Sequence, residues 1–194
     1  MPALPLLLAS SSPARQQLLS RLGLPFQHES PDIDERPLAN ETIGDMVRRL
    51  SEAKARALAS RHPNHLIIGS DQALDLDGHI LGKPGNHERA TEQLRQMSGK
   101  RITFHTGLCL LNTASDHCQL LAETYTVQFR TLDAGAINRY LRAEQPYGCA
   151  GSFKSEGLGI SLFQEFCGRD PNSLIGLPLM ALVDMLLAEG LSIP

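Results

Sequence analysis

Apolar and polar positions follow one another along the chain in a pattern that predicts strands alternating with helices. A continuous apolar run from Leu4 to Ala9 is typical of a buried strand, and the leucines that come after Pro13 lie at helical spacing. Ser12 is suited to cap this helix, Pro13 to begin it and Gly23 to end it. The pattern therefore predicts a strand, a serine loop and a helix in this part of the chain.

The most regular helical periodicity lies between Thr42 and Arg61, where apolar residues recur at a spacing of three or four with lysines and arginines between them. Helices are also predicted in three later segments: Asn86 to Met97, Asp133 to Leu141 with Asp133 as the cap, and Leu179 to Glu189. These segments supply the helical part of the predicted fold.

Strands are predicted in four further apolar runs: Leu24 to Glu29, Leu66 to Ile68, Ile102 to Leu111 and Leu120 to Phe129. Asp77-Gly78 is a strong signal for the tight turn of a hairpin. Polar or glycine-rich stretches are predicted as loops: residues 31–37, Asn112 to Gln119 and Gly148 to Gly159. With no internal repeat and no flexible linker, the chain is predicted to form one compact α/β domain over residues 1–194, with room for two lobes.

The composition excludes several classes of protein. With 194 residues, 42% of them hydrophobic and 20% charged, the chain is long and apolar enough to bury a core, which argues against disorder. The net charge of −3 argues against a broad basic surface for a nucleic-acid polymer, and the absence of tryptophan leaves few rings on which bases could stack.

The sequence also bears on cellular location. No window approaches the roughly 20 apolar residues that span a bilayer, and no signal peptide is recognisable, so we expect no membrane association. The four cysteines form no C-x-x-C pair, which indicates reduced thiols. These features together predict a cytoplasmic protein.

The common short motifs of enzymes are absent from the sequence. There is no G-x-G-x-x-G, no G-x-x-x-x-G-K-[ST], no H-E-x-x-H and no G-x-S-x-G. Dinucleotide-binding, Walker-type, zinc-protease and serine-hydrolase interpretations therefore lose their main support.

Polar and charged residues near the ends of predicted strands are the remaining candidates for chemistry. Ser10-Ser11-Ser12 and Arg15 lie at a predicted helix N-terminus, which favours an anion, although a serine run before a proline also serves as a plain cap. Asp71 directly follows the apolar run that ends at Ile68, so we expect its carboxylate at a strand end, as a metal ligand or a base. Lys54, Lys83 and Glu35 fit either a site or a solvated surface.

These residues fall in stretches that resemble the Maf family of nucleotide pyrophosphatases over nearly the whole chain. The matching stretches are Leu8-Ala9-Ser10-Ser11-Ser12-Pro13-Ala14-Arg15, Asp34-Glu35, Ser51-Glu52-Ala53-Lys54-Ala55, Ile68-Gly69-Ser70-Asp71-Gln72, Gly82-Lys83-Pro84, Met97-Ser98-Gly99-Lys100, and Asn172 with Gly176-Leu177-Pro178. The resemblance implies a Maf/ITPase-like α/β domain, with an elongated mixed sheet flanked by helices and a cleft between two lobes. It also implies hydrolysis of nucleoside triphosphates to monophosphate and pyrophosphate, with a divalent metal cation, Mg²⁺ or Mn²⁺.

The resemblance also implies roles for single residues. It makes Asp71 the proton acceptor, and it makes Glu35 and Asp71 the residues that hold the metal. The triphosphate is then bound by four residues: Ser10, Arg15, Lys54 and Lys83.

The resemblance implies that three positions help to set base choice: Ala14, Gln72 and Glu156. The branch is indicated at two places, Gln72 and the segment that holds Glu156. Gln72 and Glu156, together with Lys154, resemble the 7-methyl-GTP pyrophosphatase branch, whereas the dTTP/UTP branch usually has threonine and glutamine at the corresponding places. A glutamate can accept hydrogen bonds from the N1–H and the exocyclic amine of a guanine. Ala14 stands where the family has arginine or tryptophan, and alanine offers no ring for stacking on a base.

The first hypothesis is therefore a nucleoside triphosphate pyrophosphatase that hydrolyses 7-methyl-GTP and clears modified nucleotides from the pool. The alternatives are a dTTP/UTP pyrophosphatase of the same family and a nucleotide-sensing regulator of septum formation. The expected partner is the nucleoside triphosphate substrate, with no nucleic-acid polymer and no membrane, and a homodimer is left open.

Overall fold

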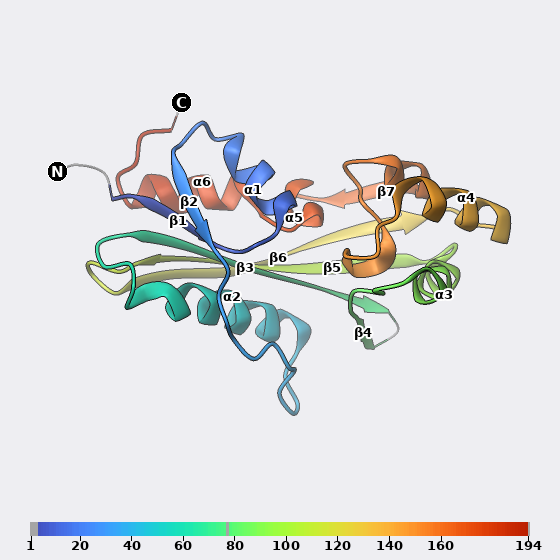
Figure 1. The fold of residues 1–194 in the computed structure, drawn as a ribbon, viewed down its shortest axis with the longest axis horizontal. Coiled ribbons are helices and arrows are strands. Elements are labelled where there is room, and N and C mark those ends of the chain that lie inside the picture. The colour runs from blue at the N-terminus through green and yellow to red at the C-terminus, as the bar shows by residue number, and fades with distance from the viewer. Residues whose placement is uncertain (1–3, 77, 194) are drawn as a thin grey trace. The chain divides into compact units, whose positions relative to one another are not determined.

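The computed structural model describes residues 4–76 and 78–193 as an α/β fold (Figure 1). The helices are α1 (Pro13–Ser20), α2 (Ile43–Ala59), α3 (His87–Met97), α4 (Ala134–Glu144), α5 (Asn172–Ile175) and α6 (Leu179–Ala188), with short 3₁₀ helices η1 (Ala150–Ser152) and η2 (Leu158–Leu162). The strands are β1 (Leu6–Ala9), β2 (Phe26–Glu29), β3 (Leu66–Leu76), β4 (His79–Leu81), β5 (Arg101–Asn112), β6 (His117–Phe129) and β7 (Phe163–Gly168).

The strands form one mixed sheet in the order β2-β1-β3-β5-β6-β7, and β4 pairs with β3. β1 lies parallel to both of its neighbours, with Leu8 opposite His28 on β2 and Ile68 on β3. The pairs β3/β4 and β6/β7 are antiparallel. The mixed α/β fold predicted from the sequence is therefore confirmed.

The described residues fall into two compact units. Unit 1 comprises those within Met1–Gln72, Thr106–Glu123 and Gly176–Pro194, and unit 2 those within Ala73–His105 and Thr124–Ile175. Three strands, β3, β5 and β6, contribute residues to both units.

In unit 1, helices cover both faces of the strands: α1 and α6 lie on one side of β1 and β3, and α2 lies on the other (Figure 1). Leu7 of β1 and Ile67 of β3 pack with Leu58 of α2 in one apolar cluster, and each of these side chains is fully buried. This burial places the inner face of α2 directly against the strands.

The backbone of α2 approaches the sheet closely at two glycines. A Cβ atom at Gly69 of β3 would lie 2.0 Å from the carbonyl oxygen of Ser51, and one at Gly107 of β5 would lie 2.1 Å from that of Val47. Because a methyl group cannot occupy this space, both positions require glycine for α2 to reach its place.

We predict that Gly69→Ala lowers the free energy of unfolding by about 1–3 kcal/mol, because the added methyl group overlaps a backbone atom and α2 must move. Thermal unfolding followed by circular dichroism measures the change. Gly44→Ala is the matched control, since a Cβ atom there meets nothing within 4 Å and alanine favours a helix. A melting temperature of Gly69→Ala equal to that of the wild type would contradict the close packing.

The core of unit 2 is rich in phenylalanine. The ring centroid of Phe163 lies 4.7 Å from that of Phe129 and 4.9 Å from that of Phe153, and Phe104 lies 5.4 Å from Phe153. All four side chains are buried in one cluster with residues of α3 and α4. Phe153 thereby anchors the glycine-rich stretch that follows α4.

The predicted helix caps are confirmed. The Ser12 hydroxyl accepts a hydrogen bond from the backbone N–H of Arg15 at 3.4 Å, and the Asp133 carboxylate accepts one from Ala136 at 2.7 Å. The helix predicted from Thr42 to Arg61 is α2, with Thr42 as its cap. Capping side chains define these boundaries in the sequence because they satisfy N–H groups that the helix leaves unpaired.

Several boundaries differ from the predictions. The prediction that Asp71 stands at a strand end is wrong, because β3 continues to Leu76, although its pairing with β1 ends at Ile68. The loop predicted from Asn112 to Gln119 is shorter, since β5 and β6 both extend into it. Strand β7 and helix α5 were not predicted. In the hairpin, Asp77 lies outside the described residues, while Gly78 has the positive φ of 84° that the turn prediction requires.

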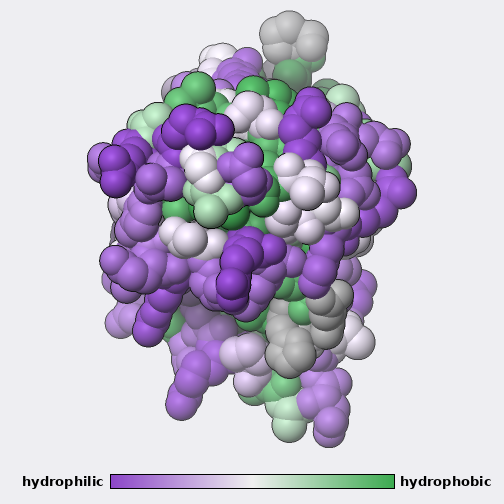
Figure 2. Space-filling view, turned by 90° about the vertical axis from the view of Figure 1, so that its right-hand side faces the viewer, coloured by the Kyte–Doolittle hydropathy of each residue, from purple (hydrophilic) through white to green (hydrophobic). Residues whose placement is uncertain are grey.

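Among the described residues, no helix combines the length and apolar character needed to cross a bilayer. Figure 2 shows one face of the molecule, where apolar side chains form small patches among hydrophilic ones. Over the described part of the chain, the exposed large apolar residues include Leu158 and Ile160 of η2, which are 52% and 55% exposed.

Candidate active site

Lys54 joins the two carboxylates that the sequence singled out. Its ammonium nitrogen Nζ lies 2.6 Å from Oδ1 of Asp71 and 2.7 Å from Oε1 of Glu35. The side chains of Lys54 and Asp71 are only 9% and 12% exposed, whereas that of Glu35 is 61% exposed. Two carboxylates and one cation thus meet at a point that is buried on one side and open to solvent on the other.

The position of Lys54 follows from the close packing of α2. Lys54 lies on the buried face of this helix, one turn after Ser51. The Ser51 hydroxyl donates to the carbonyl of Val47 at 2.6 Å and accepts from the backbone N–H of Asp71 at 2.9 Å. Ser51 therefore ties the backbone of β3 to α2, and this link places the Asp71 carboxylate next to the Lys54 ammonium.

The loop that carries Glu35 is also tied to α2. Arg49 of α2 binds the carboxylate of Glu41 at 2.6 Å through Nε and donates to the backbone carbonyl of Arg36 at 3.3 Å. These contacts hold both ends of residues 36–41, and they bring Glu35 within reach of Lys54.

Arg15 lies beside the same carboxylates. Its Nε donates to the carbonyl oxygen of Gly176 at 2.7 Å, and that oxygen also accepts from the hydroxyl of Ser70 at 2.9 Å. Burial lowers the pKa of Arg15, while the negative charges of Asp71 and Glu35 oppose that shift. A second cation thus stands next to the cluster of Lys54, Asp71 and Glu35.

The serine loop connects β1 to α1, the helix that carries Arg15. Ser10 is buried, and its hydroxyl accepts a hydrogen bond from the backbone N–H of Ser12 at 3.1 Å. Ala14 follows in the first turn of α1 and is half-buried. The predicted N-terminal anion site therefore has the expected local structure, with a strand, a short loop and a capped helix.

Gln72 follows Asp71 on β3 and is half-buried. Its side-chain amide nitrogen donates to the hydroxyl of Thr106 on β5 at 3.2 Å. This hydrogen bond orients the side-chain amide of Gln72, so the amide oxygen also has a defined direction.

Lys83 and Glu156 belong to unit 2, and both are exposed. Their charges act on the same thiol: burial raises the pKa of Cys149, Lys83 lowers it and Glu156 raises it further. Lys83 and Glu156 thus both belong to unit 2, whereas Ser10, Arg15, Glu35, Lys54 and Asp71 all belong to unit 1.

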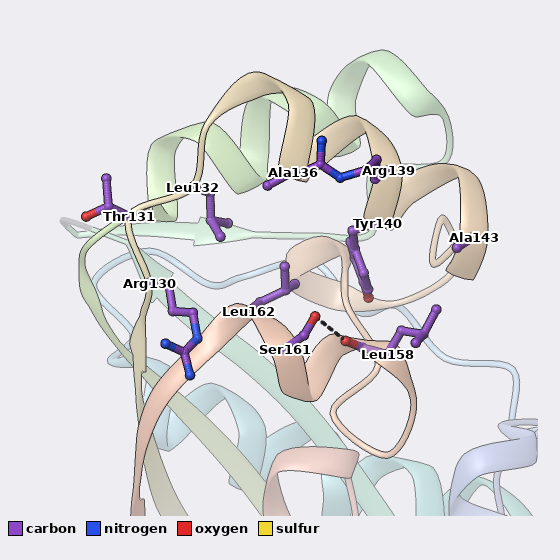
Figure 3. Close-up of a pocket in the computed structure, with 10 residues that line it drawn as sticks. All are labelled: Arg130, Thr131, Leu132, Ala136, Arg139, Tyr140, Ala143, Leu158, Ser161 and Leu162. Atoms are coloured by element: carbon purple, nitrogen blue, oxygen red, sulfur yellow. Dashed lines mark hydrogen bonds between the residues drawn. The ribbon is translucent and has the colours of Figure 1, made fainter.

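A hollow of about 410 Å³ also lies in unit 2, between α4 and η2 (Figure 3). Its walls are mainly apolar, with two arginines, and comprise Arg130, Thr131, Leu132, Ala136, Arg139, Tyr140, Ala143, Leu158, Ser161 and Leu162. None of the site residues predicted from the sequence lines this hollow.

The carboxylates suit a hard divalent cation. Within residues 4–76 and 78–193, no group of three or more histidine, cysteine, aspartate and glutamate side chains converges. Glu35 and Asp71 nevertheless both contact the Lys54 nitrogen, so the two carboxylates lie close together. Mg²⁺ is commonly bound through one or two carboxylates together with substrate phosphates, and the donor set fits that pattern.

Comparison with known proteins identifies the family. The family model described as "Maf-like protein" matches residues 5–189. The chain belongs to the Maf family. Curated relatives include "7-methyl-GTP pyrophosphatase" of Pseudomonas syringae pv. tomato, 61% identical over 97% of this chain and 98% of that protein, and the protein of the same name from Pseudomonas aeruginosa, 60% identical with the same coverage. A protein of that name from Alcanivorax borkumensis is 56% identical over 97% of this chain and 96% of its own.

Among solved structures, the Ham1 protein of Staphylococcus aureus matches 66% of this Maf chain and 72% of its own, with a TM-score of 0.44 and 18% identity. A similarity at this level does not identify a shared fold.

Several residues that build this site in the Maf chain were not recognised as site residues from the sequence. Ser51, Gly69 and Gly107 hold α2 against the strands, and Gly176 supplies the carbonyl that binds Arg15. Ser51 and Gly69 lie within stretches that resemble the family, but nothing in the sequence tells which atom each one contacts. The available signal was the position of Ser51, one helical turn before Lys54.

Proposed function

We propose that this member of the Maf family hydrolyses 7-methyl-GTP to 7-methyl-GMP and pyrophosphate. The observation that carries the proposal is the cluster of Lys54, Asp71 and Glu35 beside Arg15, in a chain about 60% identical to curated 7-methyl-GTP pyrophosphatases. The cluster combines two cations with two carboxylates, one of which, Asp71, can act as the base; these groups suit the attack of water on a phosphoanhydride.

In the proposed reaction, water attacks the α-phosphorus and the bond from this phosphorus to the bridging oxygen breaks, so that pyrophosphate leaves. Asp71 takes the proton of the attacking water through its carboxylate. Arg15 and Lys54, with the hydroxyl of Ser10, bind the phosphates and offset the charge that develops on them. We assign Lys83 to the same task, because a lysine is a mobile point charge suited to phosphate.

Glu35 and Asp71 would hold the divalent cation, Mg²⁺ or Mn²⁺. When bound, the cation supplies positive charge that offsets the charge on the phosphate oxygens. The partial exposure of Glu35 supports this assignment, because a cation that arrives with the nucleotide needs an open approach.

Base recognition is assigned to Glu156 and Gln72. The carboxylate of Glu156 accepts hydrogen bonds only, which matches the N1–H and amine donors of a guanine edge. Ala14, in the first turn of α1, leaves space where a larger side chain would contact the nucleotide.

A hydrolysis screen tests the proposal. Pyrophosphate release is measured with 7-methyl-GTP, GTP, dTTP and UTP, each with and without Mg²⁺ or Mn²⁺. The expected result is the highest kcat/KM for 7-methyl-GTP and turnover only with a divalent cation. A preference for dTTP or UTP would favour a pyrimidine pyrophosphatase, and nucleotide binding without turnover would favour a sensing role.

We predict that Glu156→Gln lowers kcat/KM for 7-methyl-GTP by about tenfold to hundredfold, because one acceptor becomes a donor that faces another donor. Turnover of dTTP and UTP should fall less or rise, particularly when Gln72→Thr is added. Steady-state kinetics on all four nucleotides measure the change.

Glu165→Gln is the control for this prediction, since Glu165 is an exposed glutamate of unit 2 on β7. It should leave the preference among nucleotides unchanged. Equal losses of Glu156→Gln on all four substrates would mean that Glu156 supports the fold and does not select the base.

A further inference from the structure

The segment that carries Glu156 is held at both ends by one helix. Residues 155–157 form a turn between η1 and η2, and Glu156 is exposed at its middle. Helix α4 supplies the contacts on both sides of Glu156, through Tyr140 and Glu144.

Lys154 provides the first attachment. Its backbone N–H donates to the hydroxyl of Tyr140 at 3.1 Å, and its ammonium binds Oε1 of Glu144 at 3.2 Å. Tyr140 is buried, and burial raises its pKa, so the phenol stays neutral. Phe153, immediately before Lys154, is fixed in the aromatic core of unit 2.

Leu158 provides the second attachment. Its backbone N–H donates to Oε2 of Glu144 at 2.8 Å, so one carboxylate binds both sides of the Glu156 turn. The two glycines that follow Glu156 pack closely against their surroundings. A Cβ atom at Gly157 would lie 2.7 Å from Oε2 of Glu144, and one at Gly159 would lie 2.2 Å from the carbonyl oxygen of Lys154.

We propose that Glu144 and Tyr140 are positioning residues for base selection: they fix the turn so that the Glu156 carboxylate is presented in one orientation. The inference rests on the proposed function, because it assigns the purpose of the turn to the base-reading role of Glu156. Neither positioning residue needs to touch the nucleotide. A carboxylate that accepts two hydrogen bonds from one base edge depends on its orientation, and an unanchored turn would lose that selectivity before it lost turnover.

Two conservative variants test whether the contacts of α4 with Lys154 and Leu158 position Glu156. Tyr140→Phe removes only the oxygen that accepts from Lys154, and Glu144→Gln keeps the shape but removes the charge that binds the Lys154 ammonium. Each is expected to lower the ratio of kcat/KM for 7-methyl-GTP to that for UTP by about threefold to tenfold, the range for one lost hydrogen bond. Amide hydrogen exchange at Lys154 and Leu158 should become faster in both variants.

Arg139→Gln is the matched control on the same helix. In Figure 3, Tyr140 points from α4 toward the segment with Ser161 and Leu162, whereas Arg139 lies along the helix away from it. Within the described part of the chain, the Arg139 side chain makes no hydrogen bond or ion pair, so its loss should change neither the ratio nor the exchange rates.

A double-mutant cycle separates positioning from a general structural role. If Tyr140 acts through Glu156, Tyr140→Phe should lower the ratio in the wild type and leave it unchanged in a Glu156→Gln background. Equal effects in both backgrounds, or equal losses on both nucleotides, would overturn the inference. So would unchanged amide exchange at Lys154 and Leu158.

The two proposals fail in different ways. A wild type that does not prefer 7-methyl-GTP, or a Glu156→Gln variant with unchanged preference, would overturn the proposed function and this inference with it. A preference that depends on Glu156 but is unaffected by Tyr140→Phe and Glu144→Gln would overturn this inference alone.

Discussion

Replacement of Asp71 by asparagine is expected to lower kcat/KM for 7-methyl-GTP by about 10²- to 10⁴-fold and to leave the protein folded. The amide has nearly the shape of the carboxylate, but it cannot accept the proton of the attacking water. Its oxygen can still accept from Lys54, whose ammonium also keeps Glu35 at 2.7 Å. The buried ammonium is therefore not left without a partner, which is the condition under which such substitutions destabilise a fold strongly.

Three measurements check this expectation: steady-state pyrophosphate release, the dissociation constant of 7-methyl-GTP, and the melting temperature. Asp75→Asn is the matched control, because Asp75 lies on the same strand and accepts from the backbone N–H of Gly78 at 2.7 Å, which an amide oxygen can also do. Its turnover should stay near that of the wild type. If Asp71→Asn retains turnover within a few-fold on a folded protein, Asp71 is not the base.

Asp71 also illustrates how far the sequence predicts this fold. The apolar run from Leu66 to Ile68 predicts the start of β3, but the polar residues after it suggest that the strand ends there. The strand continues because each polar group finds a partner elsewhere in the fold: the single Ser70 O–H is shared between the carbonyls of Gly107 and Gly176, and Asp71 binds Lys54. Such partners are distant in sequence, so local patterns cannot reveal them.

Lys54 shows the same limit on α2. The periodicity between Thr42 and Arg61 predicts the helix, but it leaves open whether Lys54 belongs to a site or to the solvated surface. Lys54 lies on the buried face, because the carboxylates of Asp71 and Glu35 meet its charge there. The type of element follows from the pattern, whereas the burial of one charged residue follows from its ion pairs.

Strand β7 and helix α5 lack a local signal altogether. In β7, Phe163 and Phe166 are separated by two polar residues, so the alternation of a half-buried strand is missing. The strand forms because its backbone pairs with β6, opposite residues such as Val127. Helix α5 has only four residues, which is too short to show helical periodicity.

Charge reversal at the phosphate-binding cations is expected to give the second large effect. Arg15→Glu should lower kcat/KM for 7-methyl-GTP on the order of 10²- to 10³-fold, since it removes a cation that meets the phosphates and adds a carboxylate that repels them. Because Asp71 and Glu35 already act electrostatically on Arg15, a glutamate there also places a third carboxylate in the cluster. Arg15→Gln is therefore made in parallel, as a variant that removes the charge without adding repulsion.

Lys83→Glu is the corresponding charge reversal at the proposed phosphate-binding lysine of unit 2. Lys83 is exposed, so its reversal should leave the fold intact, and we expect a loss in kcat/KM of about tenfold to hundredfold through a raised KM and a lowered kcat. Both constants should change, because the cation binds the phosphates in the ground state and interacts with them more strongly in the transition state, where negative charge develops.

Two reversals at other exposed arginines serve as controls: Arg21→Glu at the end of α1 in unit 1, and Arg89→Glu on α3 in unit 2. They change the net charge by the same amount as the test variants, so they separate a local effect from a general loss of attraction for the nucleotide. Losses in Arg15→Glu and Lys83→Glu but not in the controls would support the assignment of Arg15 and Lys83 to phosphate binding. Normal kinetics of both test variants, on proteins that melt like the wild type, would show that the phosphates bind elsewhere.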